Sequence, residues 1–272
     1  MKYFIDTEFL EGTQDKTIFG IKYSKTKPTI DLISIALVSE DGREYYAISK
    51  DFNLKEAWNR YDIKVETMSG DDRNIYSEGR KYKECWIRDN VLMSIFIELK
   101  EKETYDENNS EFKPFFDKDL IKEMIIKLWE LNTDKENYKE IKRLINKYGK
   151  SNKQIAEEIL EFVYNFAVTG YPKENTDKIV PKDIEFYGYY SDYDWVVFCW
   201  LFGYMKDLPK GFPMYCIDLK QELNTIEQFQ KEKQIFFLPL KEYEKYPKQI
   251  NEHNALADAK WNFELYKFLE QL

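Results

Sequence analysis

The 272 residues include 50 acidic and 41 basic side chains and one histidine, which gives a formal net charge of −9. This charge argues against a protein that coats nucleic acid non-specifically, because phosphate binding usually needs a basic surface, but it allows an enzyme that grips a few nucleotides through metal ions. Three widely spaced cysteines indicate neither a disulfide framework nor a zinc site. No run approaches the roughly 18 apolar residues that span a bilayer, and acidic residues interrupt the first apolar segment, so we expect a cytoplasmic protein without membrane contact.

Three β-strands are expected in the first fifty residues, over 3–9, 30–38 and 43–49. The second is rich in β-branched residues, and Asp41-Gly42 is a tight-turn signal that joins it to the third as an antiparallel pair. Residues 53–80 are polar and predict an irregular segment. Apolar residues at helical spacing predict a helix over 86–99.

The composition changes between about 100 and 150, where charged residues alternate with aliphatic ones and predict two amphipathic helices. Ser151 is expected to cap a following helix over 155–166. The last third alternates between types, with strands expected at 183–190 and 214–219 and helices at 194–204, 221–230 and 254–272. This order predicts an α/β fold: a mixed sheet flanked by helices, in one domain over 1–272 with a helical insertion at about 100–150.

Two carboxylates lie in the first strand. Asp6 and Glu8 are two residues apart, so their side chains project from one face, about 6.6 Å apart along the backbone. Like charges in a dry site are costly, because each raises the pKa of the other, and a divalent metal ion is the usual way to neutralise them. On the strand pattern alone, a solvated sheet face explains the pair equally well.

A second acidic segment, Tyr189-Tyr190-Ser191-Asp192-Tyr193-Asp194, lies where a strand gives way to an apolar helix. Such junctions are where sites form in α/β proteins. Either Asp192 or Asp194 could cap the helix, which is the more common use of aspartate there, while the other binds metal.

The only histidine, His253, precedes Asp258 by five residues. Within one helix that spacing is a rotation of about 140°, which would put the two side chains on different faces. Asn254 is a good N-cap, however, and places His253 on the preceding loop and Asp258 in the first turn, where the two can converge. A surface imidazole and an acid that stabilises the helix dipole remain the alternatives.

The order of these motifs resembles the DEDDh family of 3′–5′ exonucleases, which includes oligoribonuclease, RNase T and the proofreading subunits of DNA polymerases. Within it, the segments Tyr3-Phe4-Ile5-Asp6-Thr7-Glu8-Phe9 and His253-Asn254-Ala255-Leu256-Ala257-Asp258 look most like the small bacterial and phage exoribonucleases of the mycobacterial RNase T-like type. Residues 30–35, 40–47, 86–92 and 189–203 also resemble that type. The resemblance covers roughly residues 1–50, 85–98 and 151–272, whereas 53–80 match poorly and 100–150 have no counterpart in compact members.

This resemblance implies an RNase H-like five-stranded mixed sheet and a two-metal mechanism with Mg²⁺ or Mn²⁺. The implied metal ligands are Asp6, Glu8, Asp194 and Asp258, and the implied general base is His253. Asp194 is preferred over Asp192 because the acid in the family's motif directly follows an aromatic residue, here Tyr193. The implied substrate is the 3′ end of single-stranded RNA, which would be hydrolysed to nucleoside 5′-monophosphates, and a homodimer is implied by relatives.

We further expect nucleic-acid contacts from Thr7, Phe9, Trp86 and Arg88. Phe9 or Trp86 would stack on a base and Arg88 would contact a phosphate, although each of these three residue types more often serves plain packing or lies on the surface. Two other functions are compatible with the same residues: a 3′–5′ exodeoxyribonuclease of the proofreading or repair type, and a nucleic-acid-binding protein with a vestigial catalytic set. An RNase H-like endonuclease is disfavoured, because its chemistry does not call for the spacing of His253 and Asp258.

Overall fold

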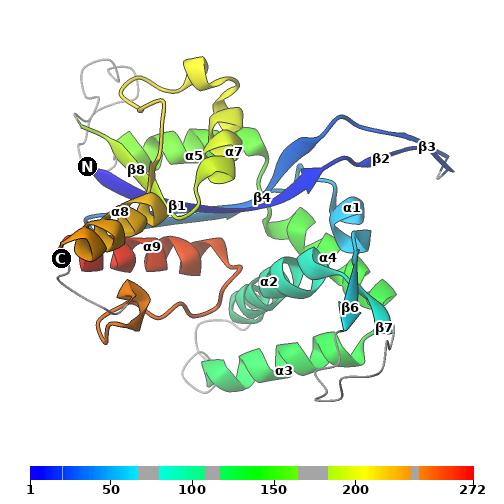
Figure 1. The fold of residues 1–272 in the computed structure, drawn as a ribbon. Coiled ribbons are helices and arrows are strands. Elements are labelled where there is room, and N and C mark those ends of the chain that lie inside the picture. Colours follow the sequence, from blue (N-terminus) through cyan, green and yellow to red (C-terminus); the bar gives the residue numbers. More distant parts are fainter. Residues whose placement is uncertain (20, 67–79, 108–116, 165–182, 234–238) are drawn as a thin grey trace, which may run out of the picture. The chain divides into compact units, whose positions relative to one another are not determined.

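The computed structural model describes residues 1–19, 21–66, 80–107, 117–164, 183–233 and 239–272 (Figure 1). They divide into two compact units. Unit 1 consists of Met1–Thr13, Lys27–Phe52 and Ile145–Leu272, and unit 2 of Gln14–Thr26 and Asn53–Leu144. Within the described ranges, no helix is long and apolar enough to cross a membrane. The single domain with an insertion at 100–150 stays a prediction, and most of that segment belongs to unit 2.

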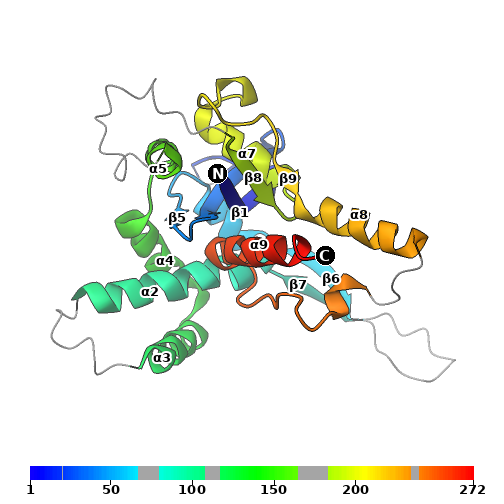
Figure 2. The ribbon, with the colours of Figure 1, turned by 90° about the vertical axis from the view of Figure 1, so that its left-hand side faces the viewer.

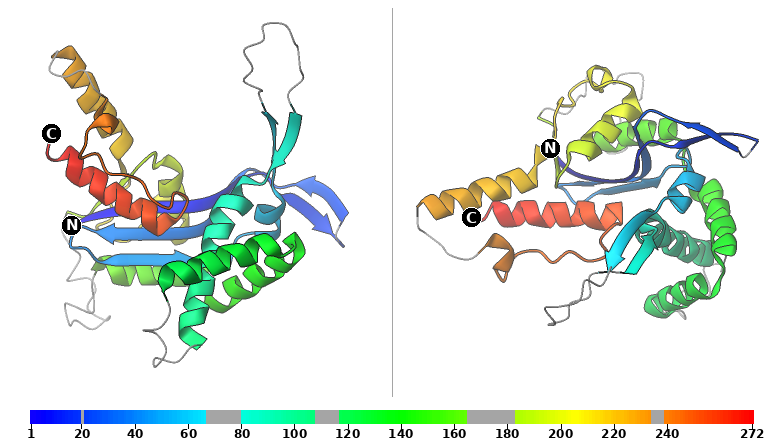
Figure 3. Two further views of the ribbon diagram at one scale, coloured as in Figure 1. Left: turned by 90° about the horizontal axis from the view of Figure 1, so that it is seen from below. Right: turned by 45° about the vertical axis from the view of Figure 1, so that its right-hand side comes forward.

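Unit 1 is built on a five-stranded sheet with the order β5-β4-β1-β8-β9. Its central strand, β1, pairs antiparallel with β4 and parallel with β8, and the blue strands of Figure 3 show the antiparallel part. The strands are β1 (Lys2–Gly12), β4 (Thr29–Ser39), β5 (Glu44–Ile48), β8 (Glu185–Gly188) and β9 (Ile217–Asp218). The predicted α/β fold with a mixed sheet flanked by helices is therefore confirmed, and it is consistent with an RNase H-like fold.

Helices cover both faces of this sheet (Figures 1 and 2). Along β1, Tyr3 and Ile5 pack against α5 and α7, while Phe4 packs on the opposite face against α8 and α9. Because both faces are covered, eight consecutive residues of β4, from Leu32 to Ser39, are buried. The helices are α5 (Asn152–Tyr164), α7 (Asp192–Phe202), α8 (Leu219–Glu232) and α9 (Ala255–Leu269), and short 3₁₀ turns span Met205–Asp207 and Leu240–Glu242.

Two of the predicted helix caps are present. The Ser151 hydroxyl accepts a hydrogen bond from the Gln154 backbone N–H at 3.2 Å, and the Gln154 side chain accepts one from the Ser151 N–H at 3.0 Å. This reciprocal pair starts α5 at Asn152, three residues earlier than predicted. Asn254 accepts from the N–H of Ala257 at 3.1 Å and starts α9 as expected.

The last two strands are shorter than predicted, especially the second, where 214–219 was expected. Asp218 ends β9 because its side chain accepts hydrogen bonds from the N–H groups of Lys220 and Gln221 and so caps α8. The residue after an N-cap is helical, so β9 cannot extend beyond Asp218. At its start, residues 214–216 do not join the sheet, which leaves two residues at this edge.

Unit 2 contains two exposed hairpins and several helices. The β2–β3 hairpin and the β6–β7 hairpin are both antiparallel, and a π-helical stretch leads into the first long helix. The elements are β2 (Asp15–Ile18), β3 (Ile21–Lys25), α1 (Leu54–Asn59), β6 (Asp62–Glu66), β7 (Arg80–Glu84), η1 (Ile87–Leu92), α2 (Met93–Glu107), α3 (Lys118–Leu131) and α4 (Asp134–Tyr148), whose last turn falls in unit 1. The helix predicted at 86–99 and the two amphipathic helices are confirmed.

The irregular segment predicted over 53–80 is wrong for the described residues. Asn53 caps α1 by accepting from the Glu56 N–H at 3.1 Å, and α1 buries Ala57 and Trp58. Residues 62–66 form β6, which pairs with β7 across a long separation in sequence. Along β6, Ile63 and Val65 alternate with charged residues, which is a strand signal that the prediction overlooked. Both side chains are exposed, so this alternation does not mark a buried face. Residues 67–79 lie outside the described part of the chain.

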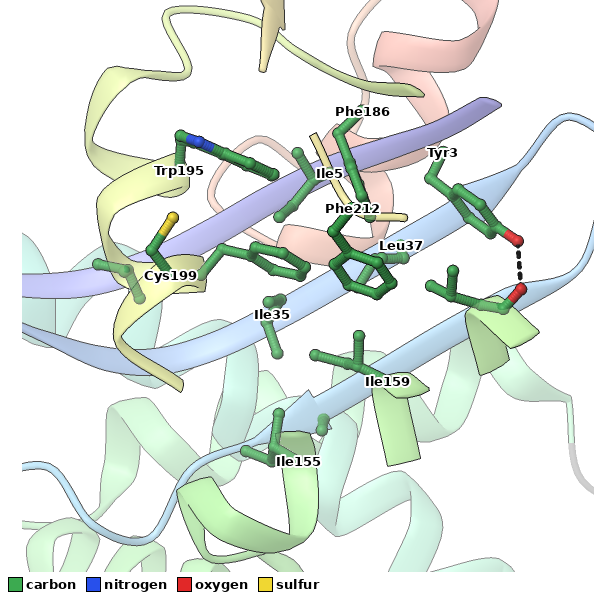
Figure 4. Packing of buried hydrophobic residues seen from close by; sticks show 14 of the residues in the cluster. Tyr3, Ile5, Ile35, Leu37, Ile155, Ile159, Phe186, Trp195, Cys199 and Phe212 are labelled. Atoms are coloured by element: carbon green, nitrogen blue, oxygen red, sulfur yellow. Dashed lines mark hydrogen bonds between the residues drawn. The ribbon is translucent and has the colours of Figure 1, made fainter. Parts of the chain in front are cut away.

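The core of unit 1 centres on an aromatic cluster around Phe186, which is fully buried on β8 (Figure 4). Its ring lies 5.1 Å from that of Phe198 and 5.3 Å from that of Trp195, both on α7. Tyr3 packs on it from β1 and donates its hydroxyl to the Val163 carbonyl at 2.9 Å. This cluster fixes α7, and hence the acidic junction at its start, against the sheet.

Phe186→Ala should lower the free energy of unfolding by about 3–5 kcal/mol, because it leaves a cavity among rings that cannot collapse to fill it. Denaturant titration measures the change. Phe229→Ala is the matched control, since Phe229 is 54% exposed on α8 and its loss should cost within about 0.5 kcal/mol. Equal costs for the two substitutions would contradict the assigned core.

Candidate active site

The two acids of β1 point away from the aromatic cluster. Side chains alternate along a strand, so Asp6 and Glu8 share a face with Phe4, the face covered by α9. A bulge in the β1–β4 register between Glu8 and Phe9 interrupts the ladder just after the second acid. The alternative of a solvated sheet face is excluded for Glu8, which is only 9% exposed.

Asp258, in the first turn of α9, completes a three-carboxylate cluster. Asp6, Glu8 and Asp258 each offer an oxygen, and these oxygens all lie within 4.8 Å of one another. Two hydrogen bonds orient the Asp258 carboxylate: one from the Gln249 side-chain amide at 2.6 Å and one from the His253 backbone N–H at 2.9 Å. The loop that carries His253 therefore contacts Asp258 through its backbone N–H, as the predicted convergence requires.

Asp194 approaches from the other side of β1. Its Oδ1 accepts from the Thr7 backbone N–H at 2.8 Å and from the Thr7 hydroxyl at 2.6 Å. Thr7 lies between Asp6 and Glu8 in sequence but faces α7, so it links α7 to the acidic strand. Asp194 is 7% exposed, whereas Asp192 is exposed to solvent. Neither caps α7: the N-cap is Ser191, and the expected capping role for one of the two aspartates is wrong.

The four acids line one pocket of about 270 Å³, together with His253. The predicted contacts Thr7 and Phe9 also line it. The sequence did not single out the remaining lining residues, which are Tyr189, Tyr190, Gln249, Trp261 and Asn262. Closeness to the predicted motifs could have identified three of them, because Tyr189 and Tyr190 directly precede the acidic junction and Asn262 lies one helical turn after Asp258. Gln249 has no such signal in the sequence.

His253 and Tyr190 have positive φ angles of 68° and 54°, in the left-handed region that most side chains avoid. Both line the pocket. The conformation of His253 lets its N–H turn back toward Asp258, which fixes the loop that carries the imidazole.

Trp86 and Arg88 belong to unit 2 and are not among the residues that line this pocket. Trp86 is 38% exposed. The Arg88 guanidinium pairs with Asp89 at 2.7 Å and with Asp134 at 2.9 Å. Their predicted nucleic-acid contacts stay predictions.

Burial and mutual repulsion make the carboxylates reluctant to ionise. Burial, and then repulsion from Asp258 and Asp194, raises the pKa of Glu8 to about 8. Burial raises the pKa of Asp194 to about 6, although the two Thr7 hydrogen bonds oppose the shift. Burial, and then repulsion from Asp194, Glu8 and Asp258, raises the pKa of Asp6 well above its usual range.

The donor set fits a hard divalent cation. Carboxylate oxygens are the ligands that Mg²⁺ and Mn²⁺ prefer, and none of the residues lining the pocket in the described chain is a lysine or arginine that could neutralise the acids instead. The pKa of Asp258 is also raised, mainly by burial, so all four carboxylates would gain from a bound cation.

A family model described as the 3′-5′ exoribonuclease Rv2179c-like domain matches residues 1–269 of the chain. Two curated proteins of Mycobacterium tuberculosis, one from strain H37Rv and one from strain CDC 1551, are each 46% identical to it over 57 residues, and both are named 3′-5′ exoribonucleases. The matched stretch is 21% of this chain and 26% of each relative, so the chain aligns with about a quarter of their length.

The metal-free chain should become less stable as the pH rises. Since burial raises the pKa of Glu8 in the folded state, the folded chain holds a proton that the unfolded chain releases, and stability falls between pH 4.5, the ordinary value for glutamate, and about 8. Mg²⁺ or Mn²⁺ binds the ionised carboxylates, so either ion should raise the melting temperature more at about pH 8 than at about pH 5.

Asp6→Asn is the control for that pair of melting curves. It removes one of the repelling charges and should therefore flatten the metal-free pH profile and reduce the stabilisation by added ions. If added Mg²⁺ or Mn²⁺ left the melting temperature unchanged at both pH values, that result would contradict a metal site among these acids.

Thr7→Val should weaken Mn²⁺ binding by about 10–100-fold, the usual effect of removing a hydrogen bond that orients a ligand. The substitution preserves shape and the backbone hydrogen bond but deletes the hydroxyl that Asp194 accepts from. Thr7→Ser keeps that hydroxyl and should bind nearly as well as the unaltered chain. Calorimetric titration compares them, and equal affinities for the valine and serine variants would show that the hydroxyl has no orienting role.

Proposed function

The chain belongs to the 3′-5′ exoribonuclease Rv2179c-like domain family, and we propose that it is a metal-dependent 3′–5′ exoribonuclease of the DEDDh type. The observation that carries the proposal is the meeting of four carboxylates and the only histidine in one pocket, from segments that are far apart in sequence. An RNase T-like relationship is part of the proposal, as are a homodimer and a cytoplasmic location.

Asp6, Glu8, Asp194 and Asp258 are the proposed metal ligands. Two bound Mg²⁺ or Mn²⁺ ions would polarise the scissile phosphate, promote ionisation of the attacking water and stabilise the leaving oxygen. The chain's own contribution is to hold the four carboxylates in position against their repulsion. Thr7, Gln249 and the His253 N–H supply the hydrogen bonds that do this.

His253 is the proposed general base. A water oxygen would form a new bond to the terminal phosphorus, and the bond from phosphorus to the 3′ oxygen of the preceding nucleotide would break. The imidazole would accept the water proton, and the departing 3′ oxygen would take a proton from solvent. The products are a nucleoside 5′-monophosphate and an RNA shortened by one nucleotide, which presents a new 3′ hydroxyl.

The pocket suits the end of a chain better than its interior. Its volume of about 270 Å³ is close to the lower limit of about 300 Å³ for small-ligand pockets, which fits a single nucleotide. Phe9 and Tyr190 line it, and Tyr190 is 65% exposed, so the Tyr190 ring can meet a nucleobase. RNA is proposed over DNA because the family and both relatives are described as exoribonucleases.

His253→Asn should lower kcat by about 10²–10⁴-fold, the usual contribution of a general base, with the fold and Mn²⁺ affinity retained. Asparagine is chosen because it tolerates the left-handed backbone at this position. The assay measures release of labelled 5′-monophosphate from single-stranded RNA labelled in its 3′-terminal nucleotide, with a matched DNA strand beside it.

Glu264→Gln, at an exposed position of α9 outside the pocket, is the control and should keep full activity. Asp6→Asn should abolish release. An unchanged rate in His253→Asn would remove the proposed base, and faster digestion of DNA than of RNA would favour the deoxyribonuclease alternative.

A further inference from the structure

Unit 2 has a cavity of its own, with a volume of about 770 Å³. Its walls come from the β2–β3 hairpin, α1, β7, η1 and the start of α4, which are labelled in Figure 1 except for the short η1. None of its lining residues lines the acidic pocket. The volume is within the range of about 300–1,000 Å³ that is typical of ligand sites.

The cavity is positively charged in a chain whose net charge is −9. Five cationic side chains line it, against three acids: Lys22, Lys55, Lys83, Arg88 and Lys135 against Asp15, Glu56 and Asp134. Each acid is already paired, Asp15 with Lys22, Glu56 with Arg60 and Asp134 with Arg88.

Lys55, Lys83 and Lys135 are left over from these pairs. Within the described residues none of the three has an ion-pair partner, and all three are exposed. They come from α1, β7 and α4, so the fold brings together positive charges from three separate segments. Ammonium groups placed in this way are suited to successive phosphates of a polyanion.

An aromatic ring accompanies the free lysines. Tyr61 is 47% exposed at the cavity, and the Lys83 ammonium lies 4.2 Å from its ring centroid. Trp58 is 6% exposed and packs against Tyr138 at 5.5 Å, so it supports the wall and is not open to a ligand. An exposed ring beside cations is the combination that binds an unpaired base together with its backbone.

We propose that this cavity binds a segment of single-stranded RNA, as a site separate from the acidic pocket. Lys55, Lys83 and Lys135 contact its phosphates, and Tyr61 stacks on a base. A single strand is specified because the bases of a duplex are stacked on one another and cannot offer a face to Tyr61. The inference rests on the proposed exoribonuclease function, which supplies RNA as the polymer.

The electrostatics of the acidic pocket make such a site useful. The residues lining that pocket include four acids and, in the part of the chain described, no lysine or arginine. Attraction of the RNA backbone to basic side chains therefore has to come from residues outside that pocket, and Lys55, Lys83 and Lys135 of the unit 2 cavity are such residues.

The test measures binding of a fluorescent single-stranded RNA to the full-length Asp6→Asn protein, so that the RNA is not degraded. Replacing both Lys55 and Lys135 by alanine should weaken binding and lower the slope of log affinity against log salt by about 0.7 for each lysine removed. Replacing both Lys118 and Lys127 by alanine is the matched control, because it removes the same charge from exposed positions on α3 outside the cavity. It should leave the slope nearly unchanged.

Tyr61→Ala should lower the affinity by about 5- to 100-fold through loss of base stacking, whereas Tyr61→Phe keeps the ring and the affinity. An RNA duplex of the same length should bind more weakly than the single strand, and Tyr61→Ala should leave the duplex affinity unchanged. Unchanged affinity and salt slope in the lysine variant, or a loss as large in the α3 control, would overturn the proposal.

The same variants with Asp6 restored separate this inference from the proposed function. Hydrolysis of a dinucleotide should be unaffected by the loss of Lys55 and Lys135, while hydrolysis of long RNA at low concentration should slow. Cavity-dependent RNA binding by a chain that hydrolyses nothing would overturn only the exoribonuclease proposal. Hydrolysis of long RNA that is indifferent to the cavity variants would overturn only the second site.

Discussion

Repulsion among buried carboxylates on the central strand is the constraint on which the rest of unit 1 depends. Asp6 and Glu8 lie in a strand with Tyr3, Phe4 and Ile5, all almost completely buried, and the fold brings Asp258 to the same face. Burial of like charges opposes folding, and the pKa of Glu8 is raised to about 8 because the folded chain disfavours its ionised form. Two apolar cores offset this cost, one packing α7 and the other packing α9 against opposite faces of β1. A cation among the acids would turn the same arrangement from a cost into a binding site.

The neighbours of the acids are arranged to hold them still. Asp194 is bound by two donors of Thr7, and Asp258 by Gln249 and the His253 N–H, so each is oriented before any ligand arrives. His253 and Tyr190 both have left-handed backbone conformations at the pocket edge. Strain of this kind costs of order 1–3 kcal/mol and collects where function requires it. Two strained residues in one pocket, beside four carboxylates with raised pKa values, support a catalytic role for this region.

Local patterns predicted much of the acidic site and little of the cavity in unit 2. The spacing of Asp6 and Glu8 on a strand, and the Asn254 cap between His253 and Asp258, specify side-chain directions through local geometry. Local geometry left Asp192 and Asp194 as alternatives, and only the resemblance, through Tyr193, preferred Asp194; the structure adds its burial and its contact with Thr7. Gln249 lies in a segment without regular structure, so it leaves no periodic signal. In β6, Ile63 and Val65 alternate with charged residues, but both are exposed and so do not mark a buried face. The free lysines of unit 2 come from three elements and are likewise brought together only by the fold.

The central claim is that four carboxylates form one divalent-metal site. Titration of the metal-free chain with Mn²⁺ at about pH 8, following the electron paramagnetic resonance signal of the free ion, counts the bound ions directly. Two ions should bind per chain, protons should be released from the carboxylates as they bind, and binding should be weaker in Asp194→Asn than in Asp192→Asn. If the free-ion signal rose from the first addition just as it does in buffer without protein, the chain would bind no Mn²⁺, and that would contradict the metal site.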